Sequence, residues 1–261
     1  MGFQGQGRPL SAEGLSRVCD TLECDMPTVW SVLSVETSGF GFLRDRRPMI
    51  LFERHIFHRR TGGRFSAAHE DISNSERGGY LSGAREYPRL ERAIALDEDA
   101  ALKSASWGVG QVMGFNHGIA GFASVTAMVA AMVRDEDTQL LAMAGFIRSN
   151  GLARALRAQD WAGFARGYNG ASFAENRYDE KLKAAHATFK AALPDLRMRG
   201  AQAALLYIGL EPGPVDGLPG KRTRAAMVRF QAENGLPQTG TLDPTTEARL
   251  LVEAFPAAIT A

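Results

Sequence analysis

The chain has 261 residues, 45% hydrophobic and 23% charged, and its 30 basic and 29 acidic residues leave a net charge of +1. This composition excludes a disordered chain, and the length suits one large domain with a smaller one. The balanced charge gives no general attraction to nucleic acid or to an anionic membrane, so we expect neither as a partner.

The cysteines and the N-terminus indicate a protein made in the cytosol. In one helix the Cα atoms of Cys19 and Cys24 would lie roughly 7.5 Å apart, beyond the limit of about 6.8 Å for a bridge, so we expect two reduced thiols. The N-terminal segment lacks the apolar core of a secretory signal. Residues 104–133 carry no Lys, Arg, Asp or Glu but contain no 18-residue apolar run, so we expect no membrane insertion.

The expected elements are mostly helices. Ser11 is a possible cap for a helix to about Leu22, and Pro27 lies early in a second helix that runs to Gly39 or Gly41. A short strand is expected over 49–52, and residues 60–87 have the composition of an irregular loop. Further helices are expected over 125–133 behind Ser124, 138–149, 160–168 behind Asp160, and 175–192.

A break at Pro194 separates a second unit. Three helical stretches follow, near 199–209, 221–234 and 244–254, joined by turn-rich segments. We therefore expect a large domain over 1–192, a linker over 193–198 and a small three-helix domain over 199–261.

The second helix places a carboxyl group on its apolar face. Helical spacing aligns Glu36 with Val29, Val32 and Leu33. Burial and the negative end of the helix dipole would both raise the pKa of Glu36. A carboxylic acid kept protonated near the working pH suits a general acid. The alternative interpretation is an exposed glutamate of no catalytic role.

Three short segments, taken in their order along the chain, resemble the motifs of a known enzyme family. They are Glu36-Thr-Ser-Gly39, Gly108-Val-Gly-Gln-Val-Met113 and Gly167-Tyr-Asn-Gly170, and the longer runs 47–55, 104–108, 111–116 and 164–170 extend them. The chain over about 12–192 resembles goose-type lysozymes and soluble lytic transglycosylases, and more closely the N-acetylmuramidase domain of phage endolysins. Thr37 stands where serine is common.

The C-terminal unit resembles the three-helix peptidoglycan-binding domain of wall hydrolases. The matching residues include Gln202, Val215-Asp-Gly217, Thr223, Phe230-Gln231 and Thr239-Gly240, whereas Leu218-Pro219 departs from the usual pattern. Most matches are turn and core positions. The two resemblances imply a mainly α protein, with a lysozyme-like α+β catalytic domain and a three-helix wall-binding domain.

The resemblance implies cleavage of the β-1,4 bond between N-acetylmuramic acid and N-acetylglucosamine, with Glu36 as general acid. Three routes then remain open: a second carboxylate activates water, a second carboxylate attacks as nucleophile, or the substrate's 6-hydroxyl attacks, as in a lytic transglycosylase. Glu53 is the best second carboxylate, and its alternative role is an ion pair with Arg54 or another arginine.

The resemblance also implies binding residues. Gln111, Asn116, Tyr168 and Asn169 would bind sugar or stabilise developing charge, and Asp216, Gly217 and Thr223 would bind the cell wall. Local capping and core hydrogen bonding are the alternative roles of the first four residues.

Two other classes compete with this interpretation. A zinc amidase would draw on His55, His58, His69, His117 and His186, but no metal-binding motif supports it, and we expect neither a metal nor another cofactor. A non-catalytic wall-binding protein is argued against only by Glu36. For an endolysin we expect a monomer that accumulates in the host cytoplasm and reaches peptidoglycan through a separate phage membrane pore.

Overall fold

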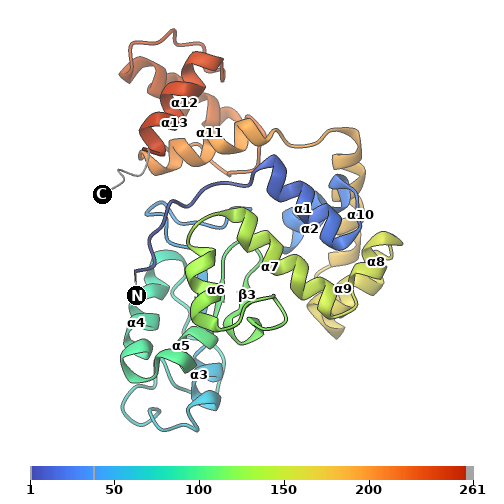
Figure 1. Cartoon of the computed structure of the whole chain (residues 1–261), viewed down its shortest axis with the longest axis vertical. Helices are drawn as coiled ribbons and strands as arrows, with labels where there is room; N and C mark the ends of the chain where they lie inside the picture. The colour runs from blue at the N-terminus through green and yellow to red at the C-terminus, as the bar shows by residue number, and fades with distance from the viewer. Residues whose placement is uncertain (1, 38, 257–261) are drawn as a thin grey trace.

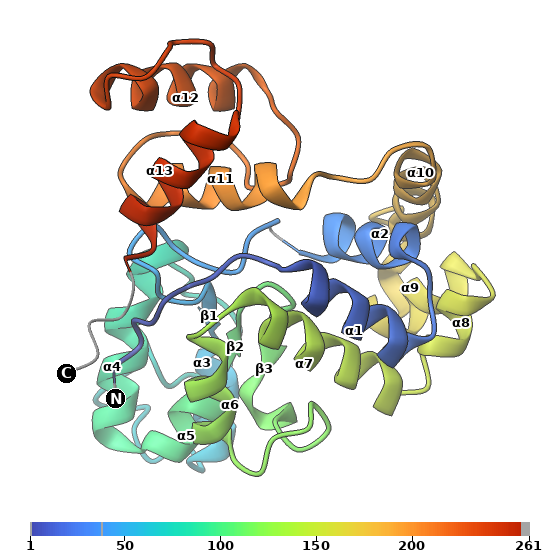
Figure 2. The same cartoon turned by 45° about the horizontal axis from the view of Figure 1, so that its top comes forward.

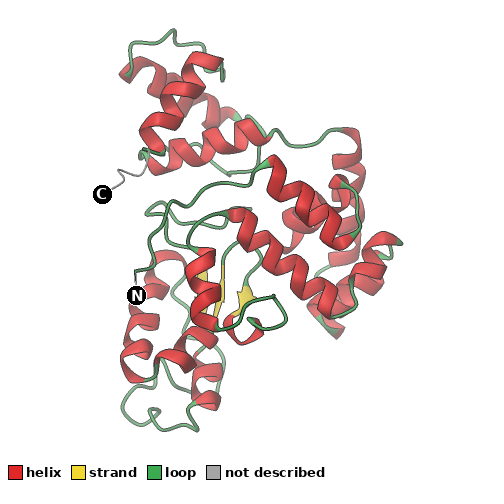
Figure 3. Ribbon diagram, viewed as in Figure 1, coloured by secondary structure: helices red, strands yellow, loops and turns green. Residues whose placement is uncertain are grey.

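The computed structural model describes residues 2–37 and 39–256. Helices dominate, and one small sheet lies in the N-terminal domain (Figure 3). The elements of this domain are α1 (Ala12–Leu22), α2 (Met26–Glu36), β1 (Ile50–Phe52), α3 (Arg54–Arg60), η1 (Gly83–Arg85), α4 (Glu86–Leu96), α5 (Glu98–Lys103), β2 (Ala105–Trp107), β3 (Val112–Met113), η2 (Gly114–Asn116), α6 (Val125–Met132), α7 (Glu136–Ser149), α8 (Ala153–Arg157), α9 (Trp161–Asn169), η3 (Ala171–Ala174) and α10 (Tyr178–Ala191). The C-terminal domain consists of α11 (Leu196–Tyr207), α12 (Lys221–Glu233) and α13 (Pro244–Ala254).

Side-chain caps fix where several helices begin. Ser11, Ser124 and Asp160 accept backbone N–H groups at the starts of α1, α6 and α9, which confirms the predicted caps. Asp25 caps α2 by accepting from Thr28 N at 3.0 Å. α1 ends at Leu22, so Cys24 lies beyond it, and both cysteines are free thiols.

Helix α2 carries Glu36 and is almost fully buried in its middle turns. Its residues from Thr28 to Leu33 are all buried, and α1 and α10 pack against it (Figure 1). The expectation that it reaches Gly39 or Gly41 is wrong, because Thr37 already has extended backbone (φ −127°, ψ 166°). The Thr37 hydroxyl donates to Leu33 O and accepts from Gly39 N, which turns the chain away from the helix axis. Glu36 is therefore the last helical residue.

The sheet is a three-stranded antiparallel meander in the order β1-β2-β3. Leu51 pairs with Ser106, and Ser106 pairs with Met113. The strand expected over 49–52 is confirmed as Ile50–Phe52. The loop expected over 60–87 is interrupted at both ends, because α3 reaches Arg60 and α4 begins at Glu86.

The C-terminal domain has the three expected helices, which Figure 2 shows above the N-terminal domain. α11 begins at Leu196 because Asp195 accepts from Arg197 N and Met198 N, so residues 196–198 of the expected linker are helical. The side-chain amides of two buried glutamines fix the loops of the C-terminal domain. Gln202 Oε1 accepts from Asp216 N and Gly217 N, and Gln231 Oε1 accepts from Gly240 N.

The two domains are in direct contact. Phe40 and Phe42 form one apolar cluster with Ala203 and Val215 of the C-terminal domain. Tyr207 of α11 donates its hydroxyl to Gly7 O at 2.6 Å, so the N-terminal segment joins this contact. None of the helices in the described ranges has the length and apolarity needed to cross a bilayer.

Candidate active site

Glu36 and Asn169 meet where two helices end. Glu36 is the last residue of α2, and Asn169 is the last residue of α9. Asn169 Nδ2 donates to Glu36 Oε1 at 3.0 Å. Helix α10 packs against both α2 and α9, so this contact is fixed by the packing of three helices rather than by a surface loop.

The surroundings of Glu36 favour its protonated form. Burial raises the pKa of Glu36 above its usual value, while the Asn169 hydrogen bond and the charge of Lys181 oppose this rise without cancelling it. Glu36 is half-buried, so one carboxyl oxygen is held by Asn169 while the group keeps access to solvent. A carboxyl group in this state can donate a proton to a bound substrate.

Tyr168 forms the apolar side of the same site. Its ring stacks on Phe164 at 5.3 Å between centroids and meets Phe146 edge-on at 6.0 Å. Burial, with the nearby Glu36 charge, holds the pKa of Tyr168 far above its usual value, so the phenol stays neutral. The sequence motif Tyr168-Asn169 thus places both residues beside Glu36.

Glu53 lies in a separate polar group at the end of β1. Glu53 Oε2 accepts from the Tyr80 hydroxyl at 2.8 Å and lies 3.1 Å from His55 Nδ1. The proposed ion pair with Arg54 does not form, since that guanidinium donates to the carbonyls of Glu76 and Arg77. Burial lowers the pKa of His55, and the Glu53 charge only partly offsets this.

A buried ion pair holds Tyr80 near Glu53. Glu86 and Arg89 of α4 are both buried and lie 2.7 Å apart. Glu86 Oε1 accepts from Leu81 N and Ser82 N, and Arg89 donates to Phe52 O. The pair therefore ties the loop that carries Tyr80 to the strand that precedes Glu53. Sequence patterns missed it, because two charged residues beside Pro88 resemble a surface turn.

Gln111 and Asn116 have local structural contacts. Gln111 Oε1 accepts from Ser106 Oγ at 2.8 Å, and its Nε2 donates to Gly108 O at 2.8 Å. These bonds stabilise the β2–β3 turn, where Gln111 has a left-handed backbone (φ 47°). Asn116 is half-buried in η2, and its backbone carbonyl accepts from Ala120 N.

Two family profiles match the chain, one over each domain. The profile of the N-acetylmuramidase family matches residues 25–190, more than half of the chain, and spans Glu36, Glu53 and Asn169. The chain belongs to the N-acetylmuramidase family. A peptidoglycan binding domain profile matches residues 197–250 of this muramidase.

A solved structure supports the same assignment. The muramidase is similar to the Burkholderia AP3 phage endolysin, with 41% sequence identity, a TM-score of 0.68, and coverage of 71% of this chain and 73% of that chain. No curated protein sequence matches it. The muramidase thus has the domain composition of an endolysin, and the expected fold class, a lysozyme-like domain followed by a helical peptidoglycan-binding domain, is confirmed.

The expected wall-binding residues of the muramidase lie around one surface pocket. Asp216 and Thr223 line a pocket of about 380 Å³ at the start of α12. Gly217 is buried, and the Thr223 hydroxyl donates to Pro212 O at 2.8 Å. The hydrogen bond from Thr223 fixes one wall of the pocket. Within residues 2–37 and 39–256, no three His, Cys, Asp or Glu residues gather as metal ligands would.

Proposed function

We propose that the muramidase is an endolysin that cleaves the β-1,4 bond between N-acetylmuramic acid and N-acetylglucosamine, with Glu36 as general acid. The observation that carries this proposal is the half-buried Glu36, whose pKa is raised and whose Oε1 is held by Asn169 at 3.0 Å. The family membership supports the substrate class.

In the first step Glu36 gives its proton to the glycosidic oxygen while the bond to the muramic acid C1 breaks. The electrons of that bond pass to the leaving sugar, and the muramyl ring becomes oxocarbenium-like. Asn169 holds Oε1, which leaves Oε2 to carry the proton. Tyr168, Gln111 and Asn116 are proposed to contact the sugars.

In the second step a nucleophile attacks C1. We propose that Glu53 accepts a proton from the attacking water, because the Tyr80 hydroxyl donates to its carboxylate and favours one orientation. The alternative is attack by the substrate's own 6-hydroxyl with Glu36 taking the proton, which gives a 1,6-anhydro product. Hydrolysis leaves a reducible muramic acid at the end of the released fragment, whereas attack by the 6-hydroxyl leaves a 1,6-anhydro end.

Product analysis tests the proposal. Purified peptidoglycan is digested in the presence of EDTA, and soluble fragments are analysed by mass spectrometry before and after borohydride reduction. We expect fragments that end in a reducible muramic acid. Fragments one water lighter and inert to borohydride would establish the transglycosylase route, whereas reducible glucosamine ends or cleaved stem peptides would contradict the proposal.

Asn169→Ala is expected to move the pH profile. The variant loses the hydrogen bond that stabilises the Glu36 carboxylate, so the pKa of Glu36 rises further. Activity requires protonated Glu36, so the alkaline limb of kcat moves to higher pH, and lost orientation lowers the maximum by about tenfold. Asn150→Ala, another asparagine at a helix end, is the control and should leave both unchanged.

Glu53→Gln is expected to lower kcat for hydrolysis by about 10²-fold, since the amide cannot accept a proton from water. The measurement is the release of reducing ends from soluble glycan strands. Glu70→Gln, on the neighbouring loop, should behave as wild type. Unchanged hydrolysis in Glu53→Gln would remove Glu53 from the mechanism and leave Glu36 in place.

The C-terminal domain is proposed to attach the enzyme to the cell wall. The pocket of Asp216 and Thr223 would bind peptidoglycan and keep a monomeric enzyme at the wall. We further propose that the enzyme accumulates in the host cytoplasm and is released by a phage membrane pore.

A further inference from the structure

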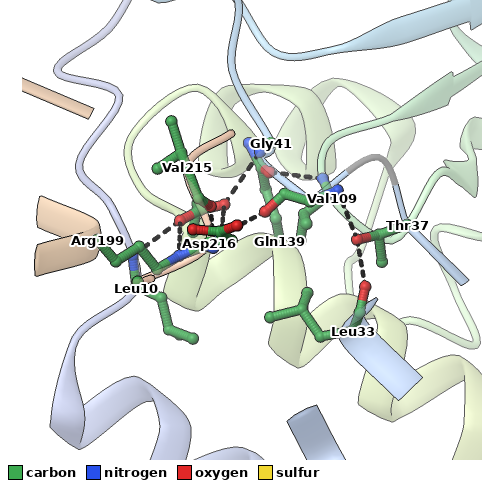
Figure 4. A network of polar contacts seen from close by, with 12 residues as sticks. Leu10, Leu33, Thr37, Gly41, Val109, Gln139, Arg199, Val215 and Asp216 are labelled. Carbon is green, nitrogen blue, oxygen red and sulfur yellow. Dashed lines mark hydrogen bonds and ion pairs between the residues drawn. The ribbon is translucent and has the colours of Figure 1, made fainter. Parts of the chain in front are cut away.

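Arg199 is a fully buried cation on the C-terminal domain. It lies in α11, and its side chain is 1% exposed. Its guanidinium donates to Glu136 Oε1 at 2.8 Å and to Gly39 O at 2.7 Å. It also donates to Val215 O, which lies beside it in Figure 4. One side chain therefore joins its own domain to two segments of the N-terminal domain.

The segment that Arg199 contacts directly follows Glu36. Gly39 lies three residues after Glu36, and Arg199 holds its carbonyl. Glu136 Oε1 accepts from Gly41 N at 3.0 Å, so the ion pair holds both ends of this short segment. A side chain at Gly41 would lie 1.8 Å from Gln139 Oε1, which shows how closely the segment is pressed onto α7.

The same contact reaches helix α2 itself. The Arg199 guanidinium lies 5.8 Å from the Trp30 ring of α2 and 5.7 Å from the Phe40 ring. Phe40 packs on Tyr207 of α11 with ring centroids 6.1 Å apart. The C-terminal domain thus covers the chain segment that leaves the catalytic helix.

We propose that Arg199 is a positioning residue for Glu36, so that the peptidoglycan-binding domain forms part of the catalytic machinery in addition to holding the wall. The proposal rests on the proposed role of Glu36. Arg199 and Glu136 hold the 39–41 segment, and Gly39 N in turn donates to the Thr37 hydroxyl, which bonds Leu33 O where α2 ends beside Glu36.

The test uses the full chain and soluble glycan strands freed of stem peptides, so that the turnover number is measured apart from attachment to intact wall. Arg199→Met removes the contact to Gly39 but leaves the Glu136 charge buried. Arg199→Met/Glu136→Gln removes both charges together and isolates the lost contact. Arg197→Ala is the control, because Arg197 lies on the same helix and pairs with Glu247 within the C-terminal domain.

We expect the double variant to lose about 10- to 100-fold in kcat per folded molecule, with little change in KM, as for a misplaced catalytic group. The alkaline limb of kcat should move to lower pH, because a displaced Glu36 loses part of the burial that raises its pKa. Arg199→Lys should restore part of kcat, and Arg197→Ala should match wild type. Circular dichroism gives the folded fraction.

A role limited to folding or wall attachment gives other results. If the folded double variant keeps wild-type kcat and pH profile on soluble strands, the proposal is overturned. The proposal is also overturned if the Arg199 and Glu136 substitutions lower only the binding to insoluble peptidoglycan. This binding is measured in proteins that also carry Glu36→Gln. If the double variant does not fold, kcat and the pH profile of Arg199→Lys are measured instead. Wild-type values for both in this variant would overturn the proposal. Activity that survives in Glu36→Gln alone would overturn the proposed function instead.

Discussion

Replacing Glu36 by glutamine is expected to abolish clearing of peptidoglycan suspensions, with kcat on glycan strands reduced by about 10³-fold. Glutamine has nearly the same shape and can still accept the Asn169 hydrogen bond, but it carries no acidic proton. The loss therefore reports the missing proton donor. Turbidity of a cell-wall suspension and release of reducing ends measure it.

The controls separate chemistry from binding. Glu36→Gln should keep the wild-type circular dichroism spectrum and should still sediment with insoluble peptidoglycan. Glu23→Gln is the matched variant, since Glu23 follows α1 as an exposed residue at a helix end and pairs with Arg157. Clearing by Glu36→Gln within a few-fold of Glu23→Gln would exclude Glu36 as the general acid.

Glu136→Ala is expected to lower the free energy of unfolding by about 3–5 kcal/mol, the usual cost of breaking a buried ion pair. Glu136 and Arg199 are each 1% exposed, and removal of the carboxylate leaves the guanidinium unpaired. Leu10 N and Gly41 N also lose their acceptor. Urea unfolding followed by tryptophan fluorescence measures the change, since Trp30 lies beside Arg199.

A partly exposed ion pair within the C-terminal domain provides the comparison for this prediction. Glu247→Ala breaks the pair with Arg197, whose side chain is 60% exposed, and it should shift the urea midpoint far less. Equal midpoints for Glu136→Ala and Glu247→Ala would mean that the buried pair does not hold the two domains together.

Much of the fold was predictable because its signals are local. Ser11, Ser124 and Asp160 cap their helices as their positions indicate, and the three C-terminal helices follow their turn motifs. The small sheet was predicted only in β1, which lies in the apolar run 49–52, whereas β2 and β3 are held by pairing rather than by propensity. Helices α3, α4, α5 and α8 were missed among charged or short segments.

The family motifs predict the residues that surround Glu36. They do not predict the buried ion pair of Glu136 and Arg199 that holds the neighbouring segment. Helical spacing and Tyr168-Asn169 indicated the residues that the structure brings together. Glu136 lies between two aspartates at the start of α7, where acids are usually solvent-exposed, and Arg199 follows Arg197 by two residues in the first turn of α11. Their pairing joins positions 63 residues apart in sequence, so only the packing of the two domains shows it.

A carbon-13 NMR titration of the Glu36 side-chain carboxyl tests the central claim most directly. Spectra of wild type and Glu36→Gln, both labelled in glutamate, differ by this one resonance. The structure predicts that the pKa of Glu36 lies above the roughly 4.3 of an exposed glutamate and that the alkaline limb of kcat/KM falls with the same midpoint. A pKa at or below that ordinary value, with kcat/KM unaffected by the titration, would contradict Glu36 as a buried general acid.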